Sequence, residues 1–415
     1  MLRDYQIEIS DNAAAILKEK KIVYLAMQVR TGKTLTSLAT AYKYGASKVL
    51  FVTKKKAISD IIDQFHRAGF DIEINVVNYE SLHKYDGDYD LVILDEAHGL
   101  GAFPKPSLRV KELLRICVGK PIIYLSGTPT PESYSQIYHQ FYVSSFSPFK
   151  NYKTFYQWAK EFVSIKQKFY FNRAVNDYSY AKENLIKPII NPYMITFTQE
   201  EAGFDSFVDE SILYVKMDDS VYKLADYMRK HKIAKNKDGE TIMGDTEVKL
   251  MNKLHQIYSG TVIVDEPEQL HKVLDYTKAE FIKQHFAGKK IAVFYKFKSE
   301  YAALLWVFDK KITFDAEQFN NSEDLVFVSQ IVSGREGLNL SSADALVFYN
   351  IDFSAVSYWQ SRARIQTKDR TKESKIYYVF AEKGIEDKIY KAVMDKKDYT
   401  LSHFKKDFLW DTLKW

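Results

Sequence analysis

The stretch Ile22-Val-Tyr-Leu-Ala-Met-Gln-Val-Arg-Thr-Gly-Lys-Thr34 decides how this sequence is interpreted. It begins with Ile22–Ala26, a short apolar run typical of a buried strand, and a helical stretch from Leu35 to Tyr44 follows it. A strand, a glycine-containing turn and a helix in this order favour phosphate binding. The backbone N–H groups at the start of the helix point toward a phosphate, and the helix dipole favours its negative charge.

The residues of the turn fit this use. Lys33 is placed to reach the β- and γ-phosphates of ATP, the Thr34 hydroxyl to bind Mg²⁺, and Gly32 to let the backbone come close. Met27 stands where the complete phosphate-loop pattern has its first glycine, so the loop taken alone also fits a chance turn. The residues expected to contact the nucleotide here are Gln28, Arg30, Thr31, Gly32, Lys33 and Thr34.

A second motif, Asp95-Glu-Ala-His98, supports the nucleotide site. It follows the apolar run Leu91–Leu94, so both acids are expected at the tip of a buried strand. Asp95 would bind Mg²⁺, and Glu96 would orient and deprotonate the attacking water, a task that needs a separate carboxylate. An exposed acidic turn is the simpler alternative, but the strand context and the spacing from Lys33 favour a catalytic pair.

The remaining pattern predicts an α/β protein with two lobes, residues 1–200 and 201–415. Apolar runs alternate with helical stretches through the first 130 residues and again from about Lys289, which predicts parallel sheets covered by helices. Helical parts are expected from about 133, over about 219–265 and over about 385–415, with an exposed polar loop at 234–245. The predicted strands are Ile22–Ala26, Lys48–Val52, Glu73–Val77, Leu91–Leu94, Pro121–Leu125, Ile291–Tyr295, Ile312–Phe314, Leu325–Ser329, Ala345–Tyr349 and Ile376–Phe380.

Composition sets broad limits. The chain has 59 Lys and Arg against 54 Asp and Glu, a net charge of +5, which permits a nucleic-acid partner without requiring one. Cys117 is the only cysteine, so an internal disulfide and a four-cysteine zinc site are excluded. No apolar run reaches the roughly 18 residues of a membrane span, and the N-terminus lacks an apolar signal core. We therefore expect a cytoplasmic protein with no membrane partner.

Together these motifs resemble superfamily 2 helicases, and within them the Swi/Snf-type DNA translocases, over nearly the whole chain. Leu2-Arg-Asp-Tyr-Gln6 resembles the adenine-reading element, which assigns Arg3 and Gln6 to the nucleotide; an ordinary amphipathic helix is the alternative. Asp95–His98 resembles motif II, a DEAH box. Ser126-Gly-Thr-Pro129 resembles motif III, and the resemblance implies that His98, Ser126 and Thr128 couple hydrolysis to lobe movement.

The second lobe carries the same resemblance. Ala292–Phe297 resembles motif IV. Ser333-Gly-Arg-Glu-Gly-Leu-Asn-Leu340 resembles motif V, whose Gly337 is assigned to the nucleotide. Leu254–Ile257 and Gly384–Ile389 resemble two further elements of the Swi/Snf branch. The resemblance implies two RecA-like lobes that hydrolyse ATP with Mg²⁺ in the cleft between them, in a short form like those of bacterial viruses, which would place the protein in a host cytoplasm.

Motif VI departs from the family pattern. Gln360 and Arg364 fit it, and Gln360 is assigned to coupling, but Thr367 stands where a second arginine belongs. An arginine must reach the γ-phosphate to neutralise charge in the transition state. We assign this role to Arg364 and Arg370, with Arg362 in reserve; a solvated basic helix face is the alternative reading of these arginines.

Movement along DNA requires a phosphate-gripping surface on both lobes. Contacts to the backbone rather than to bases predict low sequence specificity and strong salt dependence. Taken singly, each lysine among the candidates also fits an ordinary surface position. The candidates for nucleic-acid contact are Thr53, Lys54, Asn78, Tyr79, Lys296, Ser333 and Arg335.

Three functions therefore compete. The leading hypothesis is a monomeric, DNA-stimulated ATPase that moves along duplex DNA, with RNA not excluded. The second is a strand-separating helicase, for which no wedge hairpin is evident in the sequence. The third, suggested by the irregular motif VI and the missing first glycine, is a nucleotide-dependent binding protein with little hydrolysis. The intact Lys33, Asp95 and Glu96 argue against the third.

Overall fold

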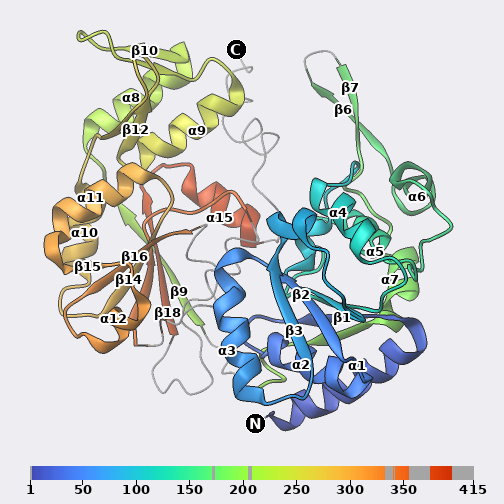
Figure 1. Cartoon of the computed structure of the whole chain (residues 1–415). Coiled ribbons are helices and arrows are strands. Elements are labelled where there is room, and N and C mark those ends of the chain that lie inside the picture. The colour runs from blue at the N-terminus through green and yellow to red at the C-terminus, as the bar shows by residue number, and fades with distance from the viewer. Residues whose placement is uncertain are drawn as a thin grey trace. The chain divides into compact units, whose positions relative to one another are not determined.

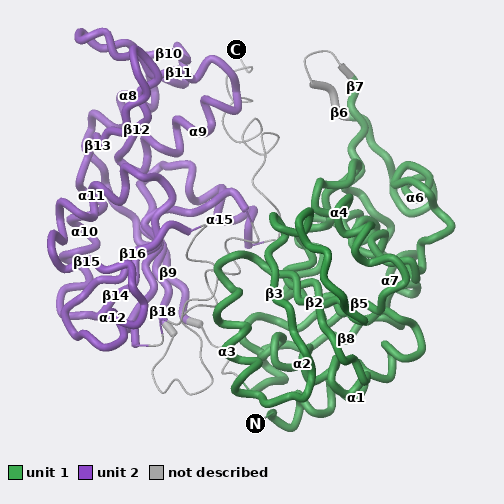
Figure 2. Tube along the Cα trace, viewed as in Figure 1, with its two compact units in different colours: residues 1–205 green, residues 206–415 purple. Residues whose placement is uncertain are grey.

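The chain folds into two compact units. The computed structural model describes residues 2–170, 173–203, 208–331, 340, 342–354 and 374–394. Unit 1 comprises Met1–Asp205 and unit 2 comprises Ser206–Trp415, and Figure 2 shows them in different colours. Each unit is built around its own six-stranded parallel sheet, which confirms the predicted α/β fold class.

Unit 1 contains a sheet in the order β3-β2-β4-β5-β1-β8, and every strand pair in it is parallel. The carboxyl ends of the strands therefore share one edge, where such sheets bind ligands. The strands of this sheet are β1 (Ile22–Met27), β2 (Lys48–Thr53), β3 (Glu73–Asn78), β4 (Leu91–Leu94), β5 (Ile122–Leu125) and β8 (Met194–Phe197). The helices of unit 1 are α1 (Asp4–Lys20), α2 (Lys33–Tyr44), α3 (Ile58–Ala68), α4 (Leu108–Ile116), α5 (Ile137–Tyr142), α6 (Phe155–Phe162) and α7 (Glu183–Ile190).

Side chains from alternate positions of these strands enter two separate cores. Ile22 and Tyr24 of β1 pack on one face of the sheet, and Val23 and Leu25 pack on the other. Helices α4 to α7 cover the first face, whereas α1, α2 and α3 cover the second. Burial on both faces explains why these strands read as continuous apolar runs in the sequence.

The aromatic-rich stretch after β5 packs on the first face. Trp158 of α6 is fully buried and contacts the rings of Tyr138, Phe155 and Phe162. These rings therefore build a helical core. The stretch also contains an antiparallel hairpin, β6 (Lys166–Tyr170) with β7 (Arg173–Asp177), which the sequence pattern did not indicate. Figure 1 shows these two strands projecting away from the sheet of unit 1.

Unit 2 contains a second parallel sheet, in the order β15-β16-β14-β17-β18-β9. One continuous hydrophobic core joins this sheet to its helices. The strands of the sheet are β9 (Val208–Val215), β14 (Ile291–Tyr295), β15 (Ile312–Thr313), β16 (Val326–Gln330), β17 (Ala345–Phe348) and β18 (Ser374–Ala381). The helices around it are α10 (Thr277–His285), α11 (Lys298–Phe308), α12 (Ala316–Asn321) and α15 (Glu386–Met394).

An additional group of elements lies between β9 and α10 in the sequence of unit 2. It consists of α8 (Asp219–His231), β10 (Ile233–Lys235), β11 (Thr241–Met243), α9 (Glu247–Tyr258), β12 (Thr261–Val264) and β13 (Leu270–Val273). Strands β10 and β11 form an antiparallel hairpin within 234–245, the segment expected to be a loop. Asn236 allows the hairpin to form, because its side-chain oxygen accepts hydrogen bonds from the backbone of Asp238 and Glu240 and so closes a tight turn.

Two polar groups lie in the interior of unit 2. They belong to Leu254–Ile257 and Gly384–Ile389, the segments that resemble further elements of the Swi/Snf branch. His255 of α9 bonds through Nε2 to Asn350 Oδ1 at 2.5 Å, and Asn350 Nδ2 donates to Glu300 Oε1 at 2.7 Å. Glu386, at the start of α15, forms an ion pair with Lys278 at 2.8 Å, and both side chains are completely buried. These elements therefore stabilise the interior of unit 2 in this structure.

Candidate nucleotide-binding site

The phosphate-loop turn lies where the first sequence motif predicts it, between β1 and α2. Two residues of the turn have left-handed backbones, Arg30 with φ 64° and Gly32 with φ 80°. The turn is held by the neighbouring β8 side of the sheet. The Gln28 backbone N–H donates to Phe197 O at 2.9 Å, and the Gln199 side chain donates to Val29 O at 3.1 Å.

Gly32 is required by packing as well as by its backbone. A Cβ atom at this position would lie 2.2 Å from Nε2 of Gln6, a distance that real contacts do not show. Gln6 is 3% exposed, accepts from the Arg3 backbone at 2.9 Å and donates to Gly32 O at 3.3 Å. The amide expected to read adenine thus braces the phosphate loop in this structure. It has one N–H and one lone pair left for a base.

The remaining turn residues are positioned at the start of α2. Lys33 is its first residue, and the Lys33 ammonium donates to Gln28 O at 3.2 Å, so the side chain folds back over the turn. Thr34 follows in the first helical turn and is partly exposed. Thr31 is buried, and its hydroxyl donates to Gln28 O at 2.8 Å, which makes it a structural residue of the loop.

The acid pair follows β4, at the same edge of the sheet. Asp95 accepts a hydrogen bond from the Thr53 hydroxyl at 2.8 Å, and the Tyr79 hydroxyl donates to Asp95 O at 2.6 Å. Burial raises the pKa of Asp95 to about 6, and the neighbouring Glu96 carboxylate adds to this rise. The Thr53 hydrogen bond and the Lys33 charge act in the opposite direction. Two adjacent acids, of which Asp95 has a raised pKa, favour a bound cation.

The donor set at this edge fits Mg²⁺ held together with a nucleotide. Asp95 and Thr34 offer a carboxylate and a hydroxyl oxygen, the hard ligands that Mg²⁺ prefers. Among the residues that the structure describes, no group of three or more His, Cys, Asp or Glu forms a metal cage. Phosphate oxygens and water would therefore have to supply the remaining ligands, as is usual for Mg²⁺ in nucleotide sites.

A hydrogen-bonded chain connects the acid pair to the next strand. Nδ1 of His98 lies 3.2 Å from Glu96 Oε2 and 3.0 Å from the Ser126 hydroxyl, which follows β5. The same hydroxyl accepts from the Thr128 backbone at 3.1 Å. Glu96 itself has a left-handed backbone, with φ 50°. The three residues expected to couple hydrolysis to movement in unit 1 thus form a chain of contacts that runs from Glu96 through His98 and Ser126 to Thr128.

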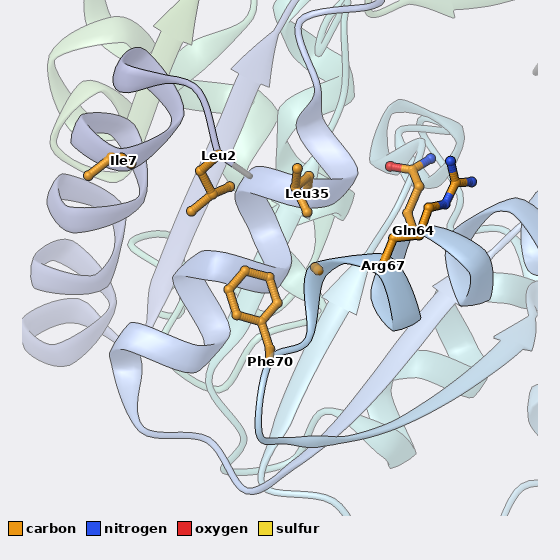
Figure 3. Close-up of a pocket in the computed structure, with 7 residues that line it drawn as sticks. Leu2, Ile7, Leu35, Gln64, Arg67 and Phe70 are labelled. Atoms are coloured by element: carbon orange, nitrogen blue, oxygen red, sulfur yellow. The ribbon is translucent and has the colours of Figure 1, made fainter.

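A cavity of about 450 Å³ lies beside the start of α2. Figure 3 shows Leu2, Ile7, Leu35 and Phe70 around it, with the side chains of Gln64 and Arg67 at one side. Apolar walls with a few polar groups are typical of small-molecule sites. Its position next to Arg3 and to the phosphate-loop helix fits a nucleobase and ribose.

Most of the expected nucleic-acid contacts in unit 1 are already engaged within the chain. Thr53 is fully buried and bonds Asp95, and Tyr79 is 5% exposed and bonds the same residue. The Asn78 side chain accepts from Ser81 N at 2.9 Å and caps the next short helix. Lys54 follows β2 at the carboxyl edge and is half-buried.

Lys296, the candidate in unit 2, is engaged in the same way. Its ammonium lies 2.7 Å from Asp352 and over the ring of Phe353, and its side chain is 14% exposed. It would have to leave Asp352 to reach a phosphate. The remaining candidates lie outside the described residues, namely Ser333, Arg335, Gly337, Gln360, Arg362, Arg364 and Arg370.

Some residues of the site gave no sequence signal. Gln199 lies 171 residues from its partner Gln28, and only the parallel pairing of β8 with β1 brings them together. Gln64 and Arg67 lie on an ordinary amphipathic helix, and their place beside α2 depends on the order of the strands. The alternation of strands and helices could have indicated that α3 lies near α2, but not which of its side chains line a cavity.

The fold and the site define a class of protein: an α/β nucleotide-binding domain whose phosphate loop, acid pair and Ser126 meet at the carboxyl edge of a parallel sheet. A family model described as the SNF2-related domain matches residues 30–272, more than half of the chain. The chain belongs to this family, and thus to the Snf2-like superfamily 2 helicases and translocases. A search of curated proteins finds no match.

Family membership sets the coarse function. SNF2-related domains are ATPase motor domains that use ATP with Mg²⁺ and act on nucleic acids, so the chain has a translocase- or helicase-like function. The matched residues include Lys33, Asp95, Glu96, His98 and Ser126. In the described part of the chain, no helix is long and apolar enough to cross a bilayer.

Proposed function

We propose that the protein is a DNA-stimulated ATPase that moves along duplex DNA through contacts to the phosphate backbone. The observation that carries this proposal is the contact chain from Glu96 through His98 to Ser126, beside a phosphate loop that bears Lys33. An ATPase without a mechanical output needs the acid and the lysine only. A link from the acid to the following strand is what a motor needs in addition.

Each residue of the site has a separate task in the proposed reaction. Mg²⁺-ATP supplies the phosphoryl group and the charge that must be neutralised. Lys33 binds the β- and γ-phosphates, and Asp95, held by Thr53, and Thr34 hold the metal. Glu96 accepts a proton from the attacking water, because it is the second carboxylate at this edge and 24% of its side chain is exposed.

Coupling in this proposal runs through the hydrogen bonds of His98. When Glu96 changes its charge or its partner, the balance between its contact and the Ser126 contact of the same Nδ1 atom changes as well. The Ser126 hydroxyl then transmits the change to the Thr128 backbone. A population shift of this kind requires different contacts in the two nucleotide states.

The proposal assigns to unit 2 the positive charges that neutralise the γ-phosphate. Arg364 and Arg370, with Arg362 in reserve, would neutralise the γ-phosphate in the transition state, Gly337 would contact the nucleotide, and Gln360 would take part in coupling. Lys54, Ser333 and Arg335 remain the candidates for gripping a phosphate backbone. The sequence supports these assignments through motifs V and VI.

The direct test is ATP turnover by the wild type and by Glu96→Gln, measured with duplex DNA, single-stranded DNA, RNA and no nucleic acid. We expect duplex DNA to stimulate the wild type most, and Glu96→Gln to bind a fluorescent ATP analogue while losing at least about 100-fold in turnover. If RNA alone stimulated turnover, the DNA assignment would fail. If wild type and variant were equally slow, a nucleotide-dependent binding protein would be the better description.

Movement itself needs a separate assay. Displacement of a third strand from a duplex reports translocation without strand separation, and we expect it to require ATP and an intact Glu96. Wild-type protein that hydrolyses ATP on duplex DNA but never displaces the third strand would contradict translocation.

Strand separation is a second candidate, and one observation favours it. The β6–β7 hairpin projects from unit 1, and the side chains of Ile165 and Val175 are 41% and 48% exposed. Exposed apolar side chains on or beside a projecting hairpin would open a fork by acting as a wedge between bases. An unwinding assay on forked DNA, with wild type and with a variant whose residues 166–177 are replaced by a short Gly-Ser linker, decides between the two functions. Unwinding that depends on the hairpin would favour a helicase.

A further inference from the structure

A run of basic residues at the end of α8 and in the β10–β11 hairpin does not belong to any motif of the site. It extends from Lys223 to Lys237 and ends in the turn between β10 and β11. Figure 1 shows the hairpin and α8 at the end of unit 2 that lies away from its six-stranded sheet. The basic residues of the run are Lys223, Arg229, Lys230, Lys232, Lys235 and Lys237.

The spacing of these residues places them along one strip. Lys223, Tyr227 and Lys230 are separated by four and three positions, so they lie on one face of α8. Lys235 and Lys237 continue the run through β10 and into the turn. From Lys223 to Lys230 the helix rises by about 10 Å, roughly three nucleotides of one DNA strand.

The lysines of the strip are exposed, and among them Lys223 lies near an acid, Asp218 at the start of α8. In the described part of the chain, Lys223, Lys230, Lys232, Lys235 and Lys237 form no ion pair, and all five are exposed. Several nearby acids are neutralised by other residues instead. These ion pairs are Asp226 with Arg229, Glu240 with Lys272, Asp245 with Lys249 and Asp265 with Lys253.

Three acids at the ends of the run are not in an ion pair among the described residues: Asp238 lies in the turn, and Asp218 and Asp219 lie at the start of α8. Five lysines against these three carboxylates leave a net positive surface. Such a surface attracts a polyanion and releases its counterions. Unpaired like charges repel one another, so a concentration of them favours a ligand of the opposite charge.

An aromatic group in the middle of the strip indicates which polyanion fits. Tyr227 is 47% exposed, and its ring lies 4.4 Å from the ring of His231, centroid to centroid. Exposed rings between lysines are typical of surfaces that contact nucleic acid, where phosphates meet the cations and sugars or bases meet the rings. An acidic peptide would use the lysines but not a stack of this kind.

We propose that the strip Lys223–Tyr227–Lys230–Lys235–Lys237 is a second nucleic-acid contact, which binds the phosphate backbone outside the motif-bearing edges of the two sheets. The inference rests on the proposed nucleic-acid partner. The strip would act as a tether that holds the protein on the nucleic acid while the ATP-dependent contacts are released. It therefore contributes to affinity and salt dependence and leaves the chemistry of the nucleotide site unchanged.

The test compares two triple variants of the full chain that remove the same charge. The first is Lys230→Gln, Lys235→Gln and Lys237→Gln. The matched control is Lys289→Gln, Lys310→Gln and Lys311→Gln, three exposed lysines of unit 2 outside the strip. Fluorescence anisotropy of a labelled duplex, without ATP, gives Kd over a range of salt concentrations. Circular dichroism and ATPase activity without DNA confirm that both variants are folded.

For the strip variant we expect the slope of log Kd against log salt to fall by about two to three, because each phosphate contact contributes about 0.9. At 0.15 M salt this corresponds to a loss of at least about tenfold in affinity. The control should change the slope by less than about one. Equal slopes for strip variant, control and wild type would overturn the inference while leaving the proposed function intact.

Two further outcomes also overturn it. If the wild type bound no nucleic acid at any salt concentration, both the proposed function and the tether would fail. If the strip variant bound DNA normally but lost binding to polyglutamate, the surface would be a site for an acidic protein instead.

Discussion

His255 makes a sharp prediction about the pH dependence of stability. It is completely buried, and burial lowers the pKa of its imidazole well below 6.5, with the positive charges of Lys296 and Lys278 acting in the same direction. Nε2 donates to Asn350, and Nδ1 has no hydrogen-bond partner in the described part of the chain. A second proton would put an N–H on Nδ1 with no acceptor to receive it.

The direction of the pH effect follows from the protonation of His255 in the folded and unfolded states. The folded state keeps His255 neutral, whereas the unfolded state takes up a proton below its ordinary pKa of about 6.5. Stability from this group is therefore complete above pH 6.5 and is lost as the pH falls below it, at about 1.4 kcal/mol per pH unit. Between pH 7.5 and 5.5 the loss amounts to about 1.4 kcal/mol.

The measurement compares urea unfolding of wild type and His255→Gln at several pH values. Groups remote from His255 titrate in both proteins and cancel in the difference, whereas Glu300, whose pKa is raised by burial, is joined to His255 through Asn350 and does not fully cancel. The wild type should lose its stability advantage over His255→Gln by about 1.4 kcal/mol from pH 7.5 to 5.5. An exposed histidine, His271, supplies the matched control His271→Gln. A pH-independent difference for His255→Gln would refute the reasoning.

Three further perturbations have defined outcomes. Lys278→Met should destabilise the protein by about 3–5 kcal/mol in urea unfolding, because it leaves the buried Glu386 without its ion-pair partner. Adding Glu386→Gln should recover part of this loss, and no recovery would contradict a paired charge. Gly32→Ala should reduce affinity for a fluorescent ATP analogue at least about tenfold, because the alanine Cβ would meet Gln6 and the backbone φ at position 32 is positive. Unchanged affinity would show that the turn can rearrange. Ser126→Ala should keep ATP affinity but reduce DNA stimulation of turnover several-fold, and equal stimulation would remove the hydroxyl from the coupling path.

Patterns that depend on neighbours in the sequence predicted much of the fold. The interior strands were predicted to within about two residues, because both faces are buried and the apolar runs are continuous. Two edge strands were not predicted. β8 is interrupted by Thr196, and β9 contains Asp209, Glu210 and Ser211, so neither shows a continuous apolar run.

The site was predictable where its residues lie next to each other in sequence, and not where the fold assembles them. The phosphate-loop turn and the acid pair are contiguous motifs, and the structure places both at one sheet edge. The functions of Thr53 and Gln6 within the chain could not be predicted, because their partners Asp95 and Gly32 are distant in sequence. The basic strip from Lys223 to Lys237 was not predicted, because the exposure of its lysines becomes evident only in the structure.

The central claim is that Glu96 activates water for ATP hydrolysis and that DNA controls this step. Steady-state ATP turnover of wild type and Glu96→Gln, each with and without duplex DNA, tests it most directly. The account predicts a wild type that duplex DNA accelerates several-fold, and a variant that binds ATP but turns over at least about 100-fold more slowly with or without DNA. A variant as active as the wild type, or a wild type whose ATP turnover does not change with DNA, would contradict this claim.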